Sequence, residues 1–144
     1  MYSAYFIAQY IINWCNENSI RITNLKLQKL LYFLQGEYVK QTGSQLIKED
    51  FYAWQLGPVI PEVYNAFSMY SSSTIPVQKV ILEIESQVSQ YIDVILAKYA
   101  KRSTWDLVEL SHRQDPWKYN YQIFGDKAII PFKSIKDFFK GGNN

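Results

Sequence analysis

The sequence predicts a mainly α-helical fold with a minor β ribbon: a single compact domain of about five to seven helices around a central helix at residues 24–41. Its 144 residues are 48% hydrophobic and 17% aromatic, which is enough for one buried core. Apolar residues recur at spacings of three and four in several stretches, and good helix-capping residues precede them. We expect one domain over residues 1–140 and a flexible tail at residues 141–144.

The first two helices are the clearest elements. Ser3 can cap a helix over residues 3–17, and Thr23 with Asn24 can cap the helix over residues 24–41. Apolar residues surround most of the second helix, so we expect it to be packed on two sides and to keep only a narrow polar strip. We interpret this strip as a solvated face, and its members are Lys26, Lys29, Glu37 and Lys40.

The middle of the chain contains the predicted β structure. Residues 50–55 are rich in aromatics and favour a short strand, and the following Gly57-Pro58 pair indicates a turn. A helix is expected over residues 61–69 because proline suits a first helical turn. Residues 75–84 are β-branched, and we expect them to pair with residues 50–55 as an edge ribbon.

The last part of the chain reads as further helices. A strict apolar stripe predicts a helix over residues 86–100, and Ser103 can cap another that ends before Gln114. Asp115-Pro116-Trp117 resembles one more helix start. Residues 127–130 are expected to be extended, and a short helix is expected over residues 131–138.

Composition narrows the classes of function. Fifteen Lys and Arg against thirteen Asp and Glu give a net charge of +2, so we do not expect nucleic acid as a partner. A single cysteine, Cys15, cannot form an intramolecular disulfide, and a single histidine, His112, leaves no ligand set for zinc. We expect neither a signal peptide nor a membrane-spanning helix, because the apolar opening has no basic residues before it and contains Gln9, Asn13 and Asn16. We expect a cytoplasmic protein with no cofactor, no metal and no membrane contact.

The chain carries no catalytic signature, so we expect that it is not an enzyme. Cys15 is interpreted as an inert packing residue. His112 with Asp115 is the minimum for acid–base chemistry, and a small hydrolase or transferase using them is one alternative. In the other alternative, His112 hydrogen-bonds backbone at a helix end and holds the turn into Pro116 and Trp117.

The surplus of aromatic residues points to a binding surface. Twelve Tyr and four Trp exceed what one small core can easily use, and such side chains often anchor protein interfaces. We predict contacts from Trp54, Tyr64 and Tyr70, and more weakly from Lys26 and Lys29. The alternative is that these aromatics cover the central helix as core.

Three blocks resemble, in order and spacing, the Panacea domain, also called the SocA-like antitoxin or phage-associated GepA-like domain. They are ITNLKLQKLLYF at residues 22–33, AWQLGPVIP at residues 53–61 and LSHRQDPW at residues 110–117. The matching residues that we single out as family scaffold are Thr23, Asn24, Leu27, Gln28, Lys29, Leu30, Tyr32, Trp54, Gly57, Pro58, Val59, His112, Pro116 and Trp117.

The resemblance implies a helical, toxin-neutralising domain from a two-gene toxin–antitoxin module. On this interpretation the chain is a type II antitoxin that binds a cognate protein toxin directly, and a second copy of the chain, in a homodimer, is a further candidate partner. The alternative is a phage-associated regulatory protein that acts on nucleic acid or a host factor. A competing view treats the shared residues as core and places specificity in residues 122–140, which include Phe132, Phe138 and Phe139.

Overall fold

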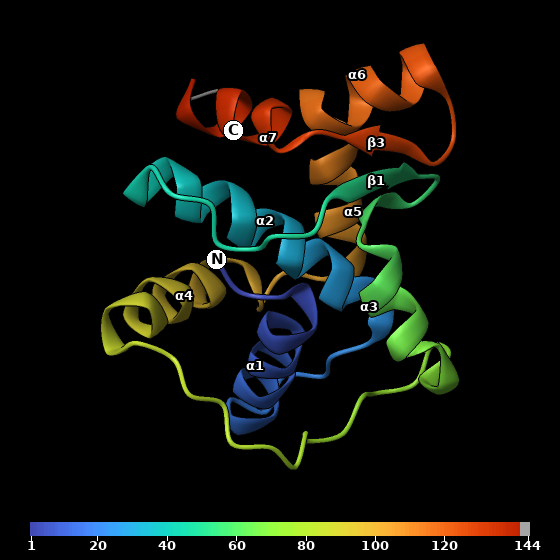
Figure 1. The fold of residues 1–144 in the computed structure, drawn as a ribbon. Coiled ribbons are helices and arrows are strands. Elements are labelled where there is room, and N and C mark those ends of the chain that lie inside the picture. Colours follow the sequence, from blue (N-terminus) through green and yellow to red (C-terminus); the bar gives the residue numbers. More distant parts are fainter. Residues whose placement is uncertain (142–144) are drawn as a thin grey trace.

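Helix α2 (Asn24–Thr42) lies at the centre of the fold, and the other elements pack around it (Figure 1). The structure is a computed structural model that describes residues 1–141; of the tail expected at residues 141–144, residues 142–144 lie outside the described part. The other elements are α1 (Ala4–Glu17), β1 (Phe51–Trp54), β2 (Gly57–Val59), α3 (Pro61–Ala66), the 3₁₀ turn η1 (Ser68–Tyr70), α4 (Ser86–Tyr99), α5 (Thr104–His112), α6 (Asp115–Phe124), β3 (Ala128–Ile130) and α7 (Phe132–Lys140). The predicted fold class, mainly α with a minor β ribbon, is confirmed.

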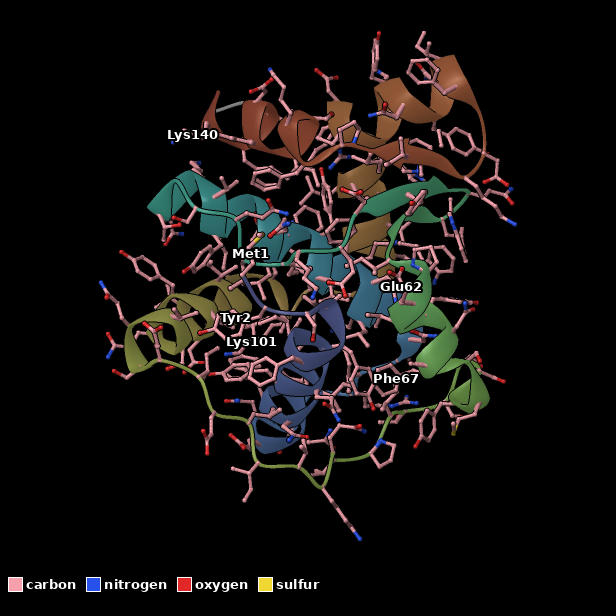
Figure 2. All side chains as sticks on the ribbon, viewed as in Figure 1. Met1, Tyr2, Glu62, Phe67, Lys101 and Lys140 are labelled. Carbon is pink, nitrogen blue, oxygen red and sulfur yellow. The ribbon has the colours of Figure 1, made fainter. Side chains whose placement is uncertain are left out.

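Local sequence signals set the ends of α2. The Thr23 hydroxyl accepts a hydrogen bond from the backbone N–H of Lys26 at 3.4 Å, and Gly43 closes the helix in the left-handed conformation with φ of 78°. Side chains fill the space around this helix (Figure 2). Most of its residues are buried because it packs against α1, α4, α5, α7 and β2, which confirms the predicted central helix.

Helix α7 approaches α2 at a glycine. A Cβ atom at Gly36 would lie 2.3 Å from the ring of Phe139, so any larger residue would push the two helices apart. Phe139 is fully buried and meets Tyr32 edge to face, with ring centroids 5.7 Å apart. Gly36 is therefore required for the close contact of α7 with the core.

The sheet differs from the expected ribbon. Its order is β2-β1-β3, and Ala53 of β1 lies opposite Pro58 of β2 and Ala128 of β3. The predicted pairing of residues 75–84 with residues 50–55 is wrong, because β2 and β3 occupy the two edges of β1. Residues 75–84 form neither helix nor strand and instead run past α1 (Figure 1).

The remaining helices match the predictions with small changes at their ends. The helix expected over residues 61–69 stops earlier, since α3 ends at Ala66 and the chain continues as the 3₁₀ turn η1. Helix α5 starts at the predicted cap, where the Ser103 hydroxyl accepts from the N–H of Asp106 at 3.1 Å. Over residues 1–141, none of the helices has the length and apolar character that crossing a membrane requires.

Candidate functional site

A groove with a volume of about 640 Å³ opens where the first turns of α2 and α5 meet the β1–β2 hairpin and α3. Its walls include two large apolar side chains that solvent reaches, Trp105 (61% exposed) and Leu56 (42% exposed). The groove is lined by Thr23, Asn24, Leu25, Trp54, Gln55, Leu56, Val59, Tyr64, Ser71, Ser72, Thr104 and Trp105. Aromatic and apolar side chains of this kind suit the binding of another molecule.

The structure brings together two of the three aromatics predicted as contacts. Trp54 and Tyr64 meet edge to face in the groove, with ring centroids 5.1 Å apart, and both are half-buried. The Lys127 ammonium lies 5.5 Å from the centroid of the Trp54 ring. Tyr70 is half-buried and packs against the core rather than lining the groove.

Trp105 is a groove residue that the sequence analysis missed. The cap at Ser103 and the inward positions Leu107 and Val108 place Trp105 on the outer side of the first turn of α5. This spacing in the sequence indicates that Trp105 is exposed. It does not indicate that Trp105 forms a wall of a groove, because the other walls come from segments that are distant in sequence.

Polar side chains of α2 hold the elements that form the groove. The Gln28 amide oxygen accepts from the N–H of Ile60 at 3.0 Å, and its amide nitrogen donates to Asn24 Oδ1 at 3.1 Å. Asn24 in turn donates to the carbonyl of Tyr64 at 2.9 Å. These buried, hydrogen-bonded groups tie the residue after β2 and helix α3 to the start of α2.

Lys29 lies beneath the hairpin rather than on the surface. Its side chain is fully buried, and Nζ donates to the carbonyl of Pro58 at 2.7 Å. Burial lowers the pKa of Lys29 to about 7. A Cβ atom at Gly57 would lie 2.9 Å from Lys29 Cε, so β2 can cross the lysine only at a glycine. A docked partner would not reach this ammonium.

The expected solvated strip on α2 is therefore wrong for three of its four members. Lys26, Lys29 and Glu37 are buried, and only Lys40 is exposed. Glu37 accepts hydrogen bonds from Lys98 Nζ at 2.7 Å and from the Tyr99 hydroxyl at 2.5 Å. The strip is covered because other elements pack on this side of α2 as well, and Lys29 and Glu37 hydrogen-bond to them.

His112 stacks on an aromatic column behind the hairpin. Its ring centroid lies 4.1 Å from that of Trp117, and the Trp117 ring lies 4.5 Å from that of Tyr121. Trp117 Nε1 donates to the carbonyl of Trp54 at 2.7 Å, which joins the column to β1. His112 Nε2 is buried and has no hydrogen-bond partner within residues 1–141. Burial lowers the pKa of His112, against a smaller raising effect from the Gln55 carbonyl.

The residues considered for chemistry are not assembled into a reactive site. No hydrogen bond joins His112 to Asp115 in the described part of the chain. Cys15 is buried, and burial raises the pKa of its thiol to about 11. No group of three or more His, Cys, Asp or Glu side chains that could hold a metal occurs among residues 1–141.

The C-terminal aromatics are divided between core and surface. Phe138 and Phe139 of α7 are buried, while Phe132 is half-buried. In residues 122–140 the exposed large apolar side chains are Ile123, Phe124 and Ile129.

The fold and site define a helical domain that carries an apolar groove, and buried polar residues of α2 hold the elements around it. The model of the antitoxin SocA-like, Panacea domain family matches residues 27–118, and the chain belongs to this family. The chain is also 32% identical over 124 residues to Antitoxin SocA of Caulobacter vibrioides (strain NA1000 / CB15N), an alignment that covers 77% of this chain and 66%, just under two thirds, of that relative. No solved structure matches the chain.

Proposed function

We propose that this chain is the antitoxin of a cytoplasmic type II toxin–antitoxin module and that it neutralises a cognate protein toxin by binding it directly. Membership of the antitoxin SocA-like family and the similarity to Antitoxin SocA support this proposal. The binding unit is the single domain over residues 1–140. The protein acts by holding its partner rather than by catalysis, so toxin and antitoxin combine in a fixed ratio.

The groove is the proposed toxin-contacting surface. The observation that carries this assignment is Trp105, a large aromatic side chain that is 61% exposed on the wall of an apolar groove. Trp54 and Tyr64 line the same groove, and Tyr70 precedes its wall at Ser71. Tryptophan and tyrosine supply large contact area at a small entropic cost, which suits them as anchors.

Buried polar residues of the family motif hold this surface in place. Gln28 and Asn24 fix Ile60 and Tyr64, and Lys29 fixes Pro58, through the hydrogen bonds described above. Lys26 is buried at the same end of α2. A groove whose walls are already fixed loses little conformational freedom on binding, which favours affinity.

Capture of the partner tests the proposed function. The tagged chain is used as bait in the native host, and the proteins recovered are expressed alone and together with it. We expect to recover one protein in a fixed ratio to this chain. Its expression alone should stop growth, and co-expression of this chain should restore growth. Recovery of nucleic acid without such a protein would refute the antitoxin proposal and favour a regulator.

Single-residue variants test the groove. Trp105→Ala is expected to weaken toxin binding at least about tenfold, as is usual for an anchor residue, while the thermal midpoint changes little because the side chain is exposed. Tyr119→Ala on α6 is the matched control, since this aromatic is similarly exposed (57%) and lies outside the groove. Equal effects of the two variants on rescue would exclude the groove as the contact surface.

A further inference from the structure

Residues 71–85, called here the strap, join η1 to α4 without forming a helix or a strand. Connections of this length inside a small domain are uncommon and are often functional. The sequence K-V-I-L-E-I at residues 79–84 favours a β-strand, yet among residues 1–141 this segment pairs with no strand. Such a conflict between local preference and fold often marks a functional segment.

The first part of the strap is attached to the body of the protein. Ile75 is fully buried, and its N–H donates to the carbonyl of Ile22 at 2.8 Å. The side chain of Asn13 on α1 then binds both backbone groups of Gln78: it accepts from the N–H at 2.7 Å and donates to the carbonyl at 3.1 Å. Asn13 thus occupies the edge of the strap that faces α1.

The opposite edge of the strap is unpaired. In an extended chain the N–H and C=O of one residue point to one edge, and those of the next residue point to the other. Gln78 bonds to Asn13, and the Val80 N–H donates to the Gln78 carbonyl at 3.0 Å. Within residues 1–141, the backbone groups of Lys79, Ile81 and Glu83 make no hydrogen bond. This edge is a template for a second strand.

From Ile81 to Ile84 the side chains of the strap alternate as those of a strand do, whereas Val80 before them is exposed. Leu82 and Ile84 are half-buried, and Ile84 packs against the core. Ile81 is 88% exposed, and the neighbouring outward positions Lys79 and Glu83 are exposed as well. Along the margin of the molecule formed by the strap, side chains project outward (Figure 2). The three outward side chains, Lys79, Ile81 and Glu83, are therefore positively charged, apolar and negatively charged in that order.

We propose that the strap pairs in an antiparallel arrangement with the strap of a second copy of this chain, with Ile81 opposite Ile81 of the partner subunit. In this register Lys79 lies opposite Glu83 of the partner subunit, and symmetry forms this pair twice. A register centred on Glu83 would place like charges together. The chain turns at Val80, whose N–H bonds to the Gln78 carbonyl, so pairing of Lys79 requires this turn to open into an extended conformation. This goes beyond the proposed function, since it concerns self-assembly through residues 79–83, which do not line the groove.

A cysteine at the symmetry axis tests the pairing. Opposed residues that exchange both backbone hydrogen bonds have Cα atoms about 5.5 Å apart, which is within the range that a disulfide spans. Ile81→Cys is therefore expected to give a covalent dimer of the full chain under mild oxidation, reversible by dithiothreitol. The wild-type chain is expected to stay monomeric on the same gel, because its Cys15 is buried.

Val77→Cys is the matched control. Val77 is also β-branched and exposed (55%) on the strap, but the proposed register separates its two copies by about 27 Å at the rise of a β-strand. It should form no disulfide. Ile81→Cys remaining monomeric, or Val77→Cys forming dimers as fast, would overturn the proposal.

Charge reversal tests the register. Added to Ile81→Cys, either Lys79→Glu or Glu83→Lys should slow disulfide formation several-fold because it brings like charges together, and the two changes combined should restore the rate. No effect of either reversal would overturn the register. Circular dichroism of each variant checks that the fold is kept. Restoration of growth in the presence of the toxin is measured in a separate assay. A failure of pairing therefore does not affect the groove assignment, and a failure of the groove assignment does not affect the pairing.

Discussion

The buried ammonium of Lys29 makes the stability of the domain depend on pH above neutrality. In the folded protein burial lowers the pKa of Lys29 from its ordinary value of 10.5 to about 7. Between these values the unfolded chain binds a proton that the folded chain does not, so the free energy of unfolding rises with pH. The gain is about 1.2 kcal/mol between about pH 7.5 and pH 8.5, and it nearly vanishes below about pH 6, where both states are protonated.

Urea unfolding of the wild type and of Lys29→Met across this pH range measures the effect. Lys29→Met keeps the length of the side chain and removes the titrating group, so its free energy of unfolding should lack the rise. Cys15, whose pKa burial raises to about 11, opposes the rise at the upper end but does so in both proteins. The difference between them therefore isolates Lys29.

The control for this experiment is Lys48→Met, because Lys48 is exposed and its replacement removes a lysine without disturbing a buried group. Lys29→Met also leaves the Pro58 carbonyl without its donor, which shifts the stability at every pH but not the slope. Parallel curves for wild type and Lys29→Met would refute the reasoning that this lysine is buried and largely neutral near pH 8.

Three further predictions concern the packing of α2. Gly36→Ala should lower the free energy of unfolding by about 1–3 kcal/mol through its clash with Phe139, and Phe139→Leu in that background should recover part of the loss; an unchanged thermal midpoint would contradict the close contact. Gln28→Leu should cost about 1–3 kcal/mol in urea unfolding by leaving the Ile60 N–H unpaired, and no loss would contradict this role. Hydrogen bonds from Lys98 and Tyr99 outweigh burial and lower the pKa of Glu37, so its contribution is present above about pH 4.5 and lost in acid. The free energy of unfolding of Glu37→Gln should therefore fall less on acidification than that of the wild type. An equal fall in the two proteins would contradict this role of Glu37.

The helices could be predicted because their signals lie within a few residues of one another. Ser3, Thr23 and Ser103 each accept a hydrogen bond from an N–H three residues ahead, and the apolar stripes follow the helical period. The family motif could also be recognised from the sequence, since it is defined by residue types in a fixed order and spacing. These features do not depend on how distant segments meet.

The β structure and the burial of charge could not be predicted in the same way. β1 pairs with Ala128–Ile130, far along the chain, whereas the β-branched residues 75–84 were the better candidates by local preference. Lys29 looks like a surface residue in a helical projection. Its carbonyl partner, Pro58, comes from another element, and only their meeting explains why a lysine is buried.

The candidate site shows the same division. Trp54 and Tyr64 were singled out because aromatic residues cluster around Gly57 and Pro58, which the structure places in β2 rather than in the expected turn. Trp105 joins them only through the placement of α5 beside the start of α2. The sequence by itself determined the helices, their caps and the family, because periodicity and capping act within one or two turns. Only the tertiary structure decided the sheet partners, the buried lysine, the walls of the groove and the free edge of the strap, because burial and pairing depend on segments that are distant in sequence.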